Sequence, residues 1–308
     1  MADALLAVTG FESAAPVLTG SARNEALFPA FNWSIGPYLR QRYFDPNEPI
    51  RVDAGLSLSA SYEPAPGWKI AGQVEHRLVG NISDIYRLNQ SRLQHVRSDA
   101  AEYDQGGATS IPQLYVSRQW KAAPDVYTRV SAGYLERMFG GVSAEVLWKP
   151  VASRLALGVE MNYVKQRAFD NVLGFQDYGV ATGHASAYYE FKNGYTGQLD
   201  VGRYLAGDVG ATVTLEREFA NGWRLGGFFT LTDVSADEFG VGSFDKGITV
   251  TVPASWLLGK PDTRVRSTTL RPFSRDGGAR LSVPGRLYEQ VRSGHREAVV
   301  GNWSGVWE

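Results

Sequence analysis

Apolar and polar residues alternate along most of this chain, and this period of two constrains the fold more than any other feature. In residues 153–165, Leu155, Leu157 and Val159 fall on one face, whereas Glu160 falls on the other. Successive side chains of a β-strand point to opposite faces, so the pattern predicts strands with one apolar and one polar face. The sequence therefore predicts an all-β protein.

The alternating segments are long for strands. We predict strands at 31–40, 51–62, 68–78, 113–121, 125–136, 142–149, 153–165, 181–191, 195–204, 209–219, 222–233 and 245–254, with weaker candidates at 264–271 and 298–307. Most run about 8–13 residues, beyond the ~5–6 residues usual in soluble sheets. They are close to the ~9–11 residues that cross a bilayer at a tilt.

The connections between these strands fall into two groups. Tight connections are predicted at 64–67, 122–124, 150–152, 192–194 and 220–222, and the last two contain Asn-Gly, a strong hairpin signal. The connections that alternate with them are mostly longer: 79–112, 137–141, 166–180, 205–208 and 234–244. Short turns on one rim and longer loops on the other are typical of outer-membrane barrels. A Greek-key sandwich has no reason to sort its connections in this way.

Hydropathy is compatible with a membrane barrel. No window approaches the ~18 apolar residues of a spanning helix, but a transmembrane barrel conceals its apolar surface on alternate residues. We therefore predict an antiparallel up-and-down transmembrane β-barrel of about 12–16 strands, even in number. Residues 1–30 are expected to form a lead-in segment and residues 31–308 the barrel.

Two long connections interrupt the barrel, at 79–112 and 271–298. Within the first, Ile82, Ile85 and Leu93 share a helical face. This spacing predicts one short amphipathic helix over 81–96, covering the mouth of the barrel.

Charge and composition exclude several functions. The chain has 31 basic and 32 acidic residues, a net charge of −1, whereas a nucleic-acid binder carries a basic stripe or patch. No cysteine is present, which excludes disulfides, thiolate metal sites and cysteine nucleophiles. The histidines show no metal-ligand spacing. His184 and Ser186 share a strand face, but positions i and i+2 lie ~6.5–7 Å apart, too far for a nucleophile–base hydrogen bond. We expect no metal, no cofactor and no catalytic residue.

The polar faces of the predicted strands carry charges of both signs. In a packed core, each unpaired ion would cost several kcal/mol, whereas a wet lumen or Arg–carboxylate ladders would satisfy them. The predicted lumen-lining residues are Arg51, Asp53, Glu75, Glu145, Arg154, Glu160, Glu190, Asp200, Glu216 and Arg224, with Lys69 beside them.

The longer connections combine aromatic, arginine and carboxylate residues. Two interpretations are open: these residues tie the loops to one another, or they contact a glycan by stacking and hydrogen bonding. The rim candidates are Glu136, Arg137, Phe139, Arg167, Tyr178, Arg203, Tyr204, Asp208, Phe239, Asp245 and Lys246, together with Phe169 and Asp177.

Several loop motifs occur in a characteristic order: GYLERMFGG at 133–141, GRYLAGD at 202–208, FGVGSFDKG at 239–247 and RPFSRDGG at 271–278, with VRSD at 96–99 and Tyr103. Together they resemble the YjbH family of exopolysaccharide-biosynthesis outer-membrane proteins, over a stretch from about residue 30 to the end. The resemblance implies a barrel of the Gram-negative outer membrane that helps to secrete a polysaccharide. It also implies outer-membrane lipid, a polysaccharide and periplasmic export proteins as partners. Family members are longer, so this chain resembles their C-terminal barrel portion, with the export signal upstream.

We therefore expect a non-enzymatic barrel that assists export or surface assembly of an exopolysaccharide. One alternative is a barrel enzyme that modifies a glycan or lipid with lumen carboxylates such as Glu145 and Glu160, which would have to lie ~5–9.5 Å apart. Another is a scaffold barrel with a plugged lumen that docks periplasmic export proteins.

Overall fold

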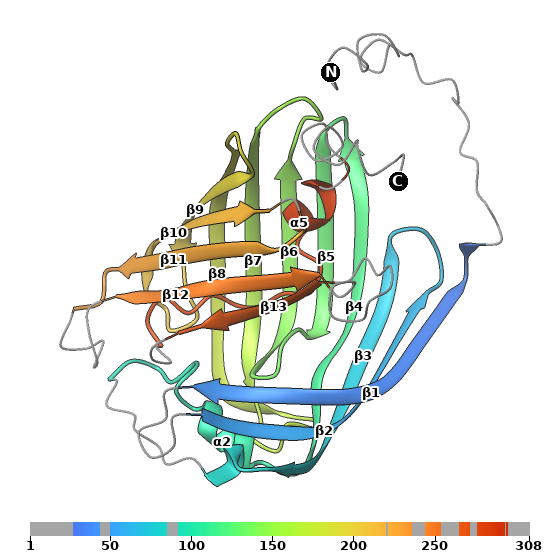
Figure 1. The fold of residues 1–308 in the computed structure, drawn as a ribbon, viewed down its shortest axis with the longest axis vertical. Coiled ribbons are helices and arrows are strands. Elements are labelled where there is room, and N and C mark those ends of the chain that lie inside the picture. Colours follow the sequence, from blue (N-terminus) through green and yellow to red (C-terminus); the bar gives the residue numbers. More distant parts are fainter. Residues whose placement is uncertain are drawn as a thin grey trace.

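The fold was analysed in a computed structural model, which describes residues 27–43, 50–84, 92–219, 221–235, 244–253, 265–271, 276–292 and 294. Within these ranges, thirteen strands form a single sheet in chain order (Figure 1). They are β1 (Ala30–Tyr43), β2 (Ile50–Glu63), β3 (Trp68–Gly80), β4 (Thr109–Ala123), β5 (Val126–Tyr134), β6 (Phe139–Trp148), β7 (Leu155–Arg167), β8 (Phe175–Glu190), β9 (Tyr195–Arg203), β10 (Val209–Glu218), β11 (Arg224–Thr232), β12 (Asp245–Pro253) and β13 (Val265–Leu270).

Each strand pairs antiparallel with the next, and the sheet curls into a nearly closed barrel (Figure 1). The predicted all-β, up-and-down barrel is confirmed. Among the described residues, no ladder joins the edge strands β1 and β13. The even strand number depends on the closing strand predicted at 298–307, which lies outside the described residues.

The barrel has its apolar side chains outside and its charged ones inside. On β7, Val159 and Met161 are 52% and 68% exposed, whereas Glu160 and Asn162 are 2% and 6% exposed. Soluble proteins show the opposite distribution, because carboxylates are almost never fully buried there unless paired. The period of two in the sequence thus separates an apolar outer belt from a polar lumen. No helix among the described residues is long and apolar enough to cross a membrane.

The two rims of the barrel differ, although less than predicted. The turn rim carries the short connections 64–67, 124–125, 149–154, 191–194 and 219–223, and the loop rim carries 81–108, 135–138, 168–174, 204–208 and 233–244. Asn193 and Gly194 both have positive φ, as a tight hairpin turn requires. On the loop rim, however, 135–138 and 204–208 are as short as turns. The turn rim also carries the longer connection 254–264, so the contrast in length rests mainly on 81–108.

The predicted loop helix over 81–96 is wrong in its extent. The structure has a single 3₁₀ turn, η2 (Ile82–Asp84), and an α-helix, α2 (Ala100–Gln105), while 85–91 lie outside the described residues. Residues 96–98 are not helical because their backbone N–H groups bond instead to the carboxylate of Asp276. A second α-helix, α5 (Leu287–Arg292), lies in the connection predicted to be loop throughout.

Two apolar clusters lie inside the barrel, and both include residues that follow β13. The larger one joins Val96, Tyr103 and Phe139 to Ala279 and Leu281. The smaller one is made of Leu147, Ala156, Tyr188, Leu287 and Tyr288. We call residues 276–292 the plug segment, because they supply the material that packs against the inner wall.

Candidate functional site

The plug segment lies within the lumen, with α5 seen against the inner wall near β5 and β6 (Figure 1). The wall residues that it meets form a row across four strands. In the sheet register, Arg129 on β5 is opposite Glu145 on β6, which is opposite Glu160 on β7, which is opposite His184 on β8. All four side chains are buried. The site is therefore a charged patch of barrel wall covered by the protein's own chain.

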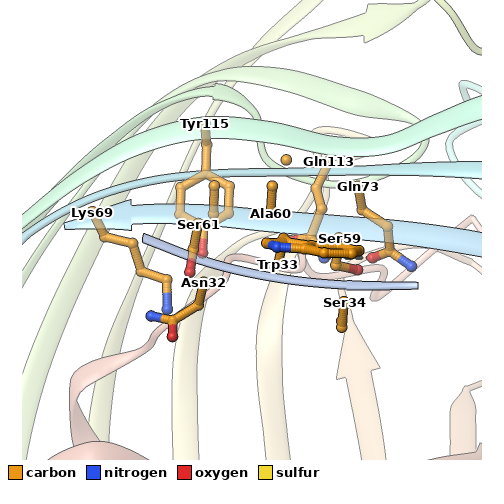
Figure 2. A pocket seen from close by; sticks show the side chains of 12 residues that line it. Asn32, Trp33, Ser34, Ser59, Ala60, Ser61, Lys69, Gln73, Gln113 and Tyr115 are labelled. Carbon is orange, nitrogen blue, oxygen red and sulfur yellow. Dashed lines mark hydrogen bonds between the residues drawn. The ribbon is translucent and has the colours of Figure 1, made fainter. Parts of the chain in front are cut away.

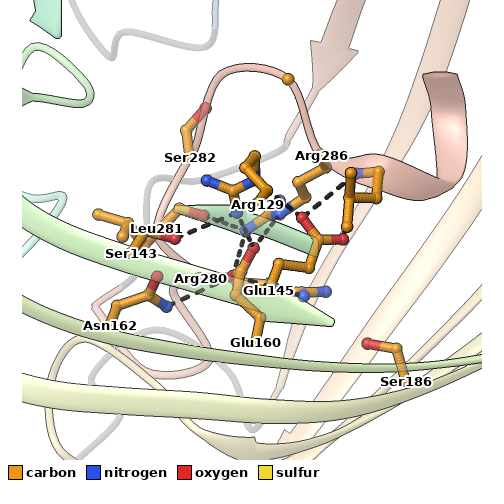
Figure 3. A network of polar contacts seen from close by, with 12 residues as sticks. Arg129, Ser143, Glu145, Glu160, Asn162, Ser186, Arg280, Leu281, Ser282 and Arg286 are labelled. Atoms are coloured by element: carbon orange, nitrogen blue, oxygen red, sulfur yellow. Dashed lines mark hydrogen bonds and ion pairs between the residues drawn. The ribbon is translucent and has the colours of Figure 1, made fainter. Parts of the chain in front are cut away.

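Arg129 bridges the two carboxylates of this row (Figure 3). Its Nε lies 2.9 Å from Oε2 of Glu145, and its Nη2 lies 3.3 Å from Oε2 of Glu160. The remaining donors reach the hydroxyls of Ser131 and Ser143. With no exposed surface on Arg129, this buried charge is compensated entirely by protein groups, as burial requires.

The plug segment supplies further cations to the same row (Figure 3). Arg286 forms a bidentate pair with Glu160, with both N–O distances 2.9 Å. Arg280 lies 2.8 Å from Oδ1 of Asp200 and 3.7 Å from Glu160. Burial alone would lower the pKa of Arg286, but the Glu160 carboxylate outweighs it and raises the pKa above its usual value. The guanidinium is thus charged when it holds the plug.

Helix α5 completes the attachment toward the turn rim. The backbone N–H of Leu287 donates to both oxygens of Glu145. The Tyr288 ring stacks on Tyr188, with centroids 3.9 Å apart, and its hydroxyl donates to Glu190. Burial and the Glu190 carboxylate both raise the pKa of Tyr288, so this hydroxyl remains a donor.

At the loop rim, the start of the plug segment binds the long connection 81–108. The Asp276 carboxylate accepts from the N–H groups of residues 96–98, at 2.8–3.0 Å, and from the Ser98 hydroxyl. Arg97 in turn forms a bidentate pair with Glu136, at 2.6 and 3.0 Å. The same Glu136 accepts from the backbone N–H of Ser282. Three segments far apart in the sequence are thereby fastened together.

Nine of the ten predicted lumen residues lie on the inner face of barrel strands, and Arg154 lies in the turn just before β7. Arg51, Asp53, Glu75, Glu145, Glu160 and Asp200 are buried, and Arg154, Glu190, Glu216 and Arg224 are partly exposed. Near the loop rim, Asp53 accepts from the N–H of Ile82, and Glu75 pairs with Arg40. Near the turn rim, Glu216 pairs with Arg224. The charges form ion pairs rather than a uniformly charged channel.

The predicted rim residues mostly hold the loops together. Phe139 and Tyr204 have no exposed surface, so neither ring presents a face to a sugar in this structure. Asp208 accepts from the N–H of Gly278, and Asp245 pairs with Arg271. Other contacts are Arg137 with Asp104, Tyr178 with the Leu205 carbonyl, Arg203 with the Gly207 carbonyl and Lys246 over the Phe244 ring. Phe239 lies outside the described residues, whereas Phe169 and Asp177 are exposed.

Arg167 shows this structural use of a rim arginine most clearly. Its side chain is buried and donates to five backbone carbonyls, those of Ile111, Glu136, Arg137, Asn171 and Val172, at 2.9–3.3 Å. A planar guanidinium has enough fixed donors to join two loops, 135–138 and 168–174, to strand β4 at one point. Within the loop rim, therefore, Arg167 serves as the centre of a hydrogen-bond network.

The side chains considered for catalysis are His184, Ser186, Glu145 and Glu160. The Ser186 hydroxyl donates to Asp200, and neither ring nitrogen of His184 has a hydrogen-bond partner in the described ranges. Glu145 and Glu160 are opposite one another but are bridged by Arg129 and covered by the plug segment. No group of His, Asp and Glu in the described part of the chain could hold a metal ion.

Sequence reasoning missed Arg129, Asp276, Arg280 and Arg286. Arg129 was detectable, because it alternates with the outward Val130 in a predicted strand. The plug arginines carry no periodic signal. The sequence did contain an indirect signal for them. Carboxylates outnumber cations on the inner faces of β6 to β10, so they have to pair with cations from elsewhere in the chain.

The fold and site define the class: a β-barrel with an apolar outer surface and a charged lumen partly occupied by its own chain. The chain belongs to the YjbH family, described as "Exopolysaccharide biosynthesis protein YbjH", whose sequence model matches residues 4–293. The matched range begins earlier than about residue 30, where the stretch with the characteristic loop motifs begins.

Among curated proteins, the chain is 33% identical over 269 residues to the "Uncharacterized lipoprotein YjbH" of Escherichia coli (strain K12). The alignment covers 85% of this chain but 38% of that relative. Among solved structures, it is similar to OmpTdeltaL8, a loop L8 deletion mutant of OmpT, an outer membrane protein of Vibrio cholerae. That match has a TM-score of 0.35 and 12% identity and covers 72% of this chain and 86% of the other, too distant to support a functional inference.

Proposed function

We propose that this chain is a non-enzymatic β-barrel of the bacterial outer membrane that assists export or surface assembly of an exopolysaccharide. The observation that carries the proposal is the inverted distribution of side chains in a member of this family. Met161 and Tyr163 face outward at 68% and 59% exposure, while charged residues fill the interior. Such a surface is stable in lipid, where a closed barrel leaves no backbone group unpaired.

The orientation follows from the rims. In outer-membrane barrels the short turns face the periplasm and the longer loops face outward. The turn rim would therefore meet periplasmic export proteins, and the loop rim the cell surface. The description of the Escherichia coli relative as a lipoprotein is compatible with this location. The near-zero net charge gives no support to nucleic acid as a partner.

A second candidate function is favoured by the plug segment. A lumen occupied by residues 276–292 suits a scaffold that docks periplasmic export proteins without conducting. The two candidates differ in whether the plug segment opens, and recording of conductance in lipid bilayers distinguishes them.

The proposal is tested in cells that secrete the polysaccharide. The gene that encodes this chain is deleted, and secreted and cell-retained carbohydrate are measured, with the wild-type gene restored as a control. We expect secretion to fall to near background while cells stay intact, and restoration to recover it. Unchanged secretion in the deleted strain would rule the proposed function out.

A further inference from the structure

A polar cavity lies along β1 to β4, next to the part of the wall that carries the charge row from β5 to β8. Its volume is about 400 Å³, within the roughly 300–1,000 Å³ of small-molecule sites. Figure 2 shows that polar side chains from β1 to β4 gather around it. We call it the wall cavity.

The register of the sheet explains why these side chains meet. One cross-strand row consists of Ser34, Ser59, Gln73 and Gln113, each paired with the next in neighbouring strands. The adjacent inward row consists of Asn32, Ser61, Ala71 and Tyr115. Positions two apart on a strand share a face, so the two rows form one continuous polar surface.

The groups on this surface both donate and accept hydrogen bonds. Gln113 donates to the side-chain oxygen of Gln73 at 3.1 Å, and Gln73 donates to the Ser57 hydroxyl at 3.0 Å. Among the described residues, the side chains of Ser59 and Ser61 make no hydrogen bond, and they lie beside this chain of amides. Hydroxyls and amides match sugar hydroxyls, which are also donors and acceptors at once.

Charge is nearly absent from the wall cavity. Lys69 is the one ionised residue of its lining, and it pairs with Glu63 at 3.5 Å. On the wall from β7 to β11, by contrast, Glu160, Asp200 and Arg224 form ion pairs with the plug segment. An uncharged ligand would meet no unpaired charge here, and the Tyr115 ring offers an apolar face beside the amides.

We propose that the wall cavity is a subsite for an uncharged, polyhydroxylated stretch of a saccharide chain. This inference rests on the proposed function, because it assigns the glycan a place in the barrel. The second row lies close to the 64–67 turn, so the subsite sits toward the turn rim, where a chain arriving from the periplasm would enter.

The absence of cysteine allows a direct test in the full protein, reconstituted in lipid vesicles. Ser59→Cys and Ser61→Cys each place one thiol in the wall cavity with little change in size. Labelling by a thiol-specific reagent is timed with and without oligosaccharides made by partial hydrolysis of the secreted polysaccharide. At about ten times the Kd, we expect labelling to slow about tenfold, as the unoccupied fraction falls.

Two controls accompany the variants. Ala152→Cys, in the exposed turn between β6 and β7, should label equally fast with and without saccharide. Ser143→Cys, buried beneath Arg129, should label slowly in both conditions. Gln113→Glu, combined with Ser61→Cys, adds a carboxylate to the subsite and should weaken the protection.

The subsite would be overturned if the thiols at 59 and 61 label equally fast with and without saccharide. It would also be overturned if they do not label at all. Loss of secretion in the deleted strain would leave the proposed function standing in that case. Protection of the thiols with unchanged secretion would support the subsite and refute the proposed function.

Discussion

Several ion pairs of the lumen share one side chain, that of Glu160. It is 2% exposed and lies within 4 Å of three arginines, Arg129, Arg280 and Arg286. Glu160→Gln keeps the shape of the side chain but leaves those guanidinium groups without their shared carboxylate. Because an unpaired buried charge is costly, we expect a loss of about 3–5 kcal/mol in the free energy of unfolding. Denaturant unfolding in lipid vesicles measures it.

Glu63→Gln is the matched control at this scale. Glu63 also forms an ion pair, with Lys69, but the two side chains are 34% and 46% exposed. Exposed pairs contribute about 0–1 kcal/mol, so this change should be nearly silent. Equal effects of the two substitutions would show that burial of the Glu160 network does not stabilise the barrel.

At the scale of elements, we expect the plug segment to control whether the lumen conducts. Arg280 and Arg286 contribute its ion pairs with Asp200 and Glu160. The double substitution Arg280→Ala, Arg286→Ala removes both. A loss of about 3 kcal/mol in plug attachment would raise the open fraction roughly 100-fold. Single-channel recording in planar lipid bilayers should then show far more open time than the wild-type protein.

Arg217→Ala provides the comparison for this experiment. Arg217 is an exposed arginine on the outer face, stacked over Tyr195 and Phe219 rather than paired in the lumen. Its removal should leave conductance unchanged. If the double variant is as silent as the wild type, the plug segment does not control the opening, and the scaffold function gains support.

For the whole molecule, the apolar outer belt is the property on which membrane insertion depends. Met161 lies on the outer face of β7 and is 68% exposed. Met161→Lys places a charge in the belt, which costs about 2–4 kcal/mol near the middle of a bilayer. We expect the folded fraction in vesicles to fall, seen as loss of the heat-modifiable band on gels.

Val151→Lys makes the same kind of change in the turn between β6 and β7, where Val151 is 49% exposed. Charges near the interface cost about 0–1 kcal/mol, so this variant should fold normally. Normal folding of both variants would contradict the burial of the belt in lipid.

Most strands were predictable from the sequence, and the loop elements were not. The predicted strand at 153–165 corresponds to β7 (Leu155–Arg167), because alternation is a local property of consecutive residues. The helix predicted over 81–96 is wrong in its extent: residues 92–96 are not helical, and Asp276 binds the backbone of residues 96–98. A contact across 180 positions leaves no local signal.

By itself, the sequence determined which side chains face outward and which face the lumen, since a strand assigns its residues to faces by parity alone. The tertiary structure decided what fills that lumen. Arg286 meets Glu160 across 126 positions, and Tyr288 stacks on Tyr188. Only the closed curvature of the sheet brings these groups together, because ion pairing and stacking depend on distance in space and not on spacing along the chain.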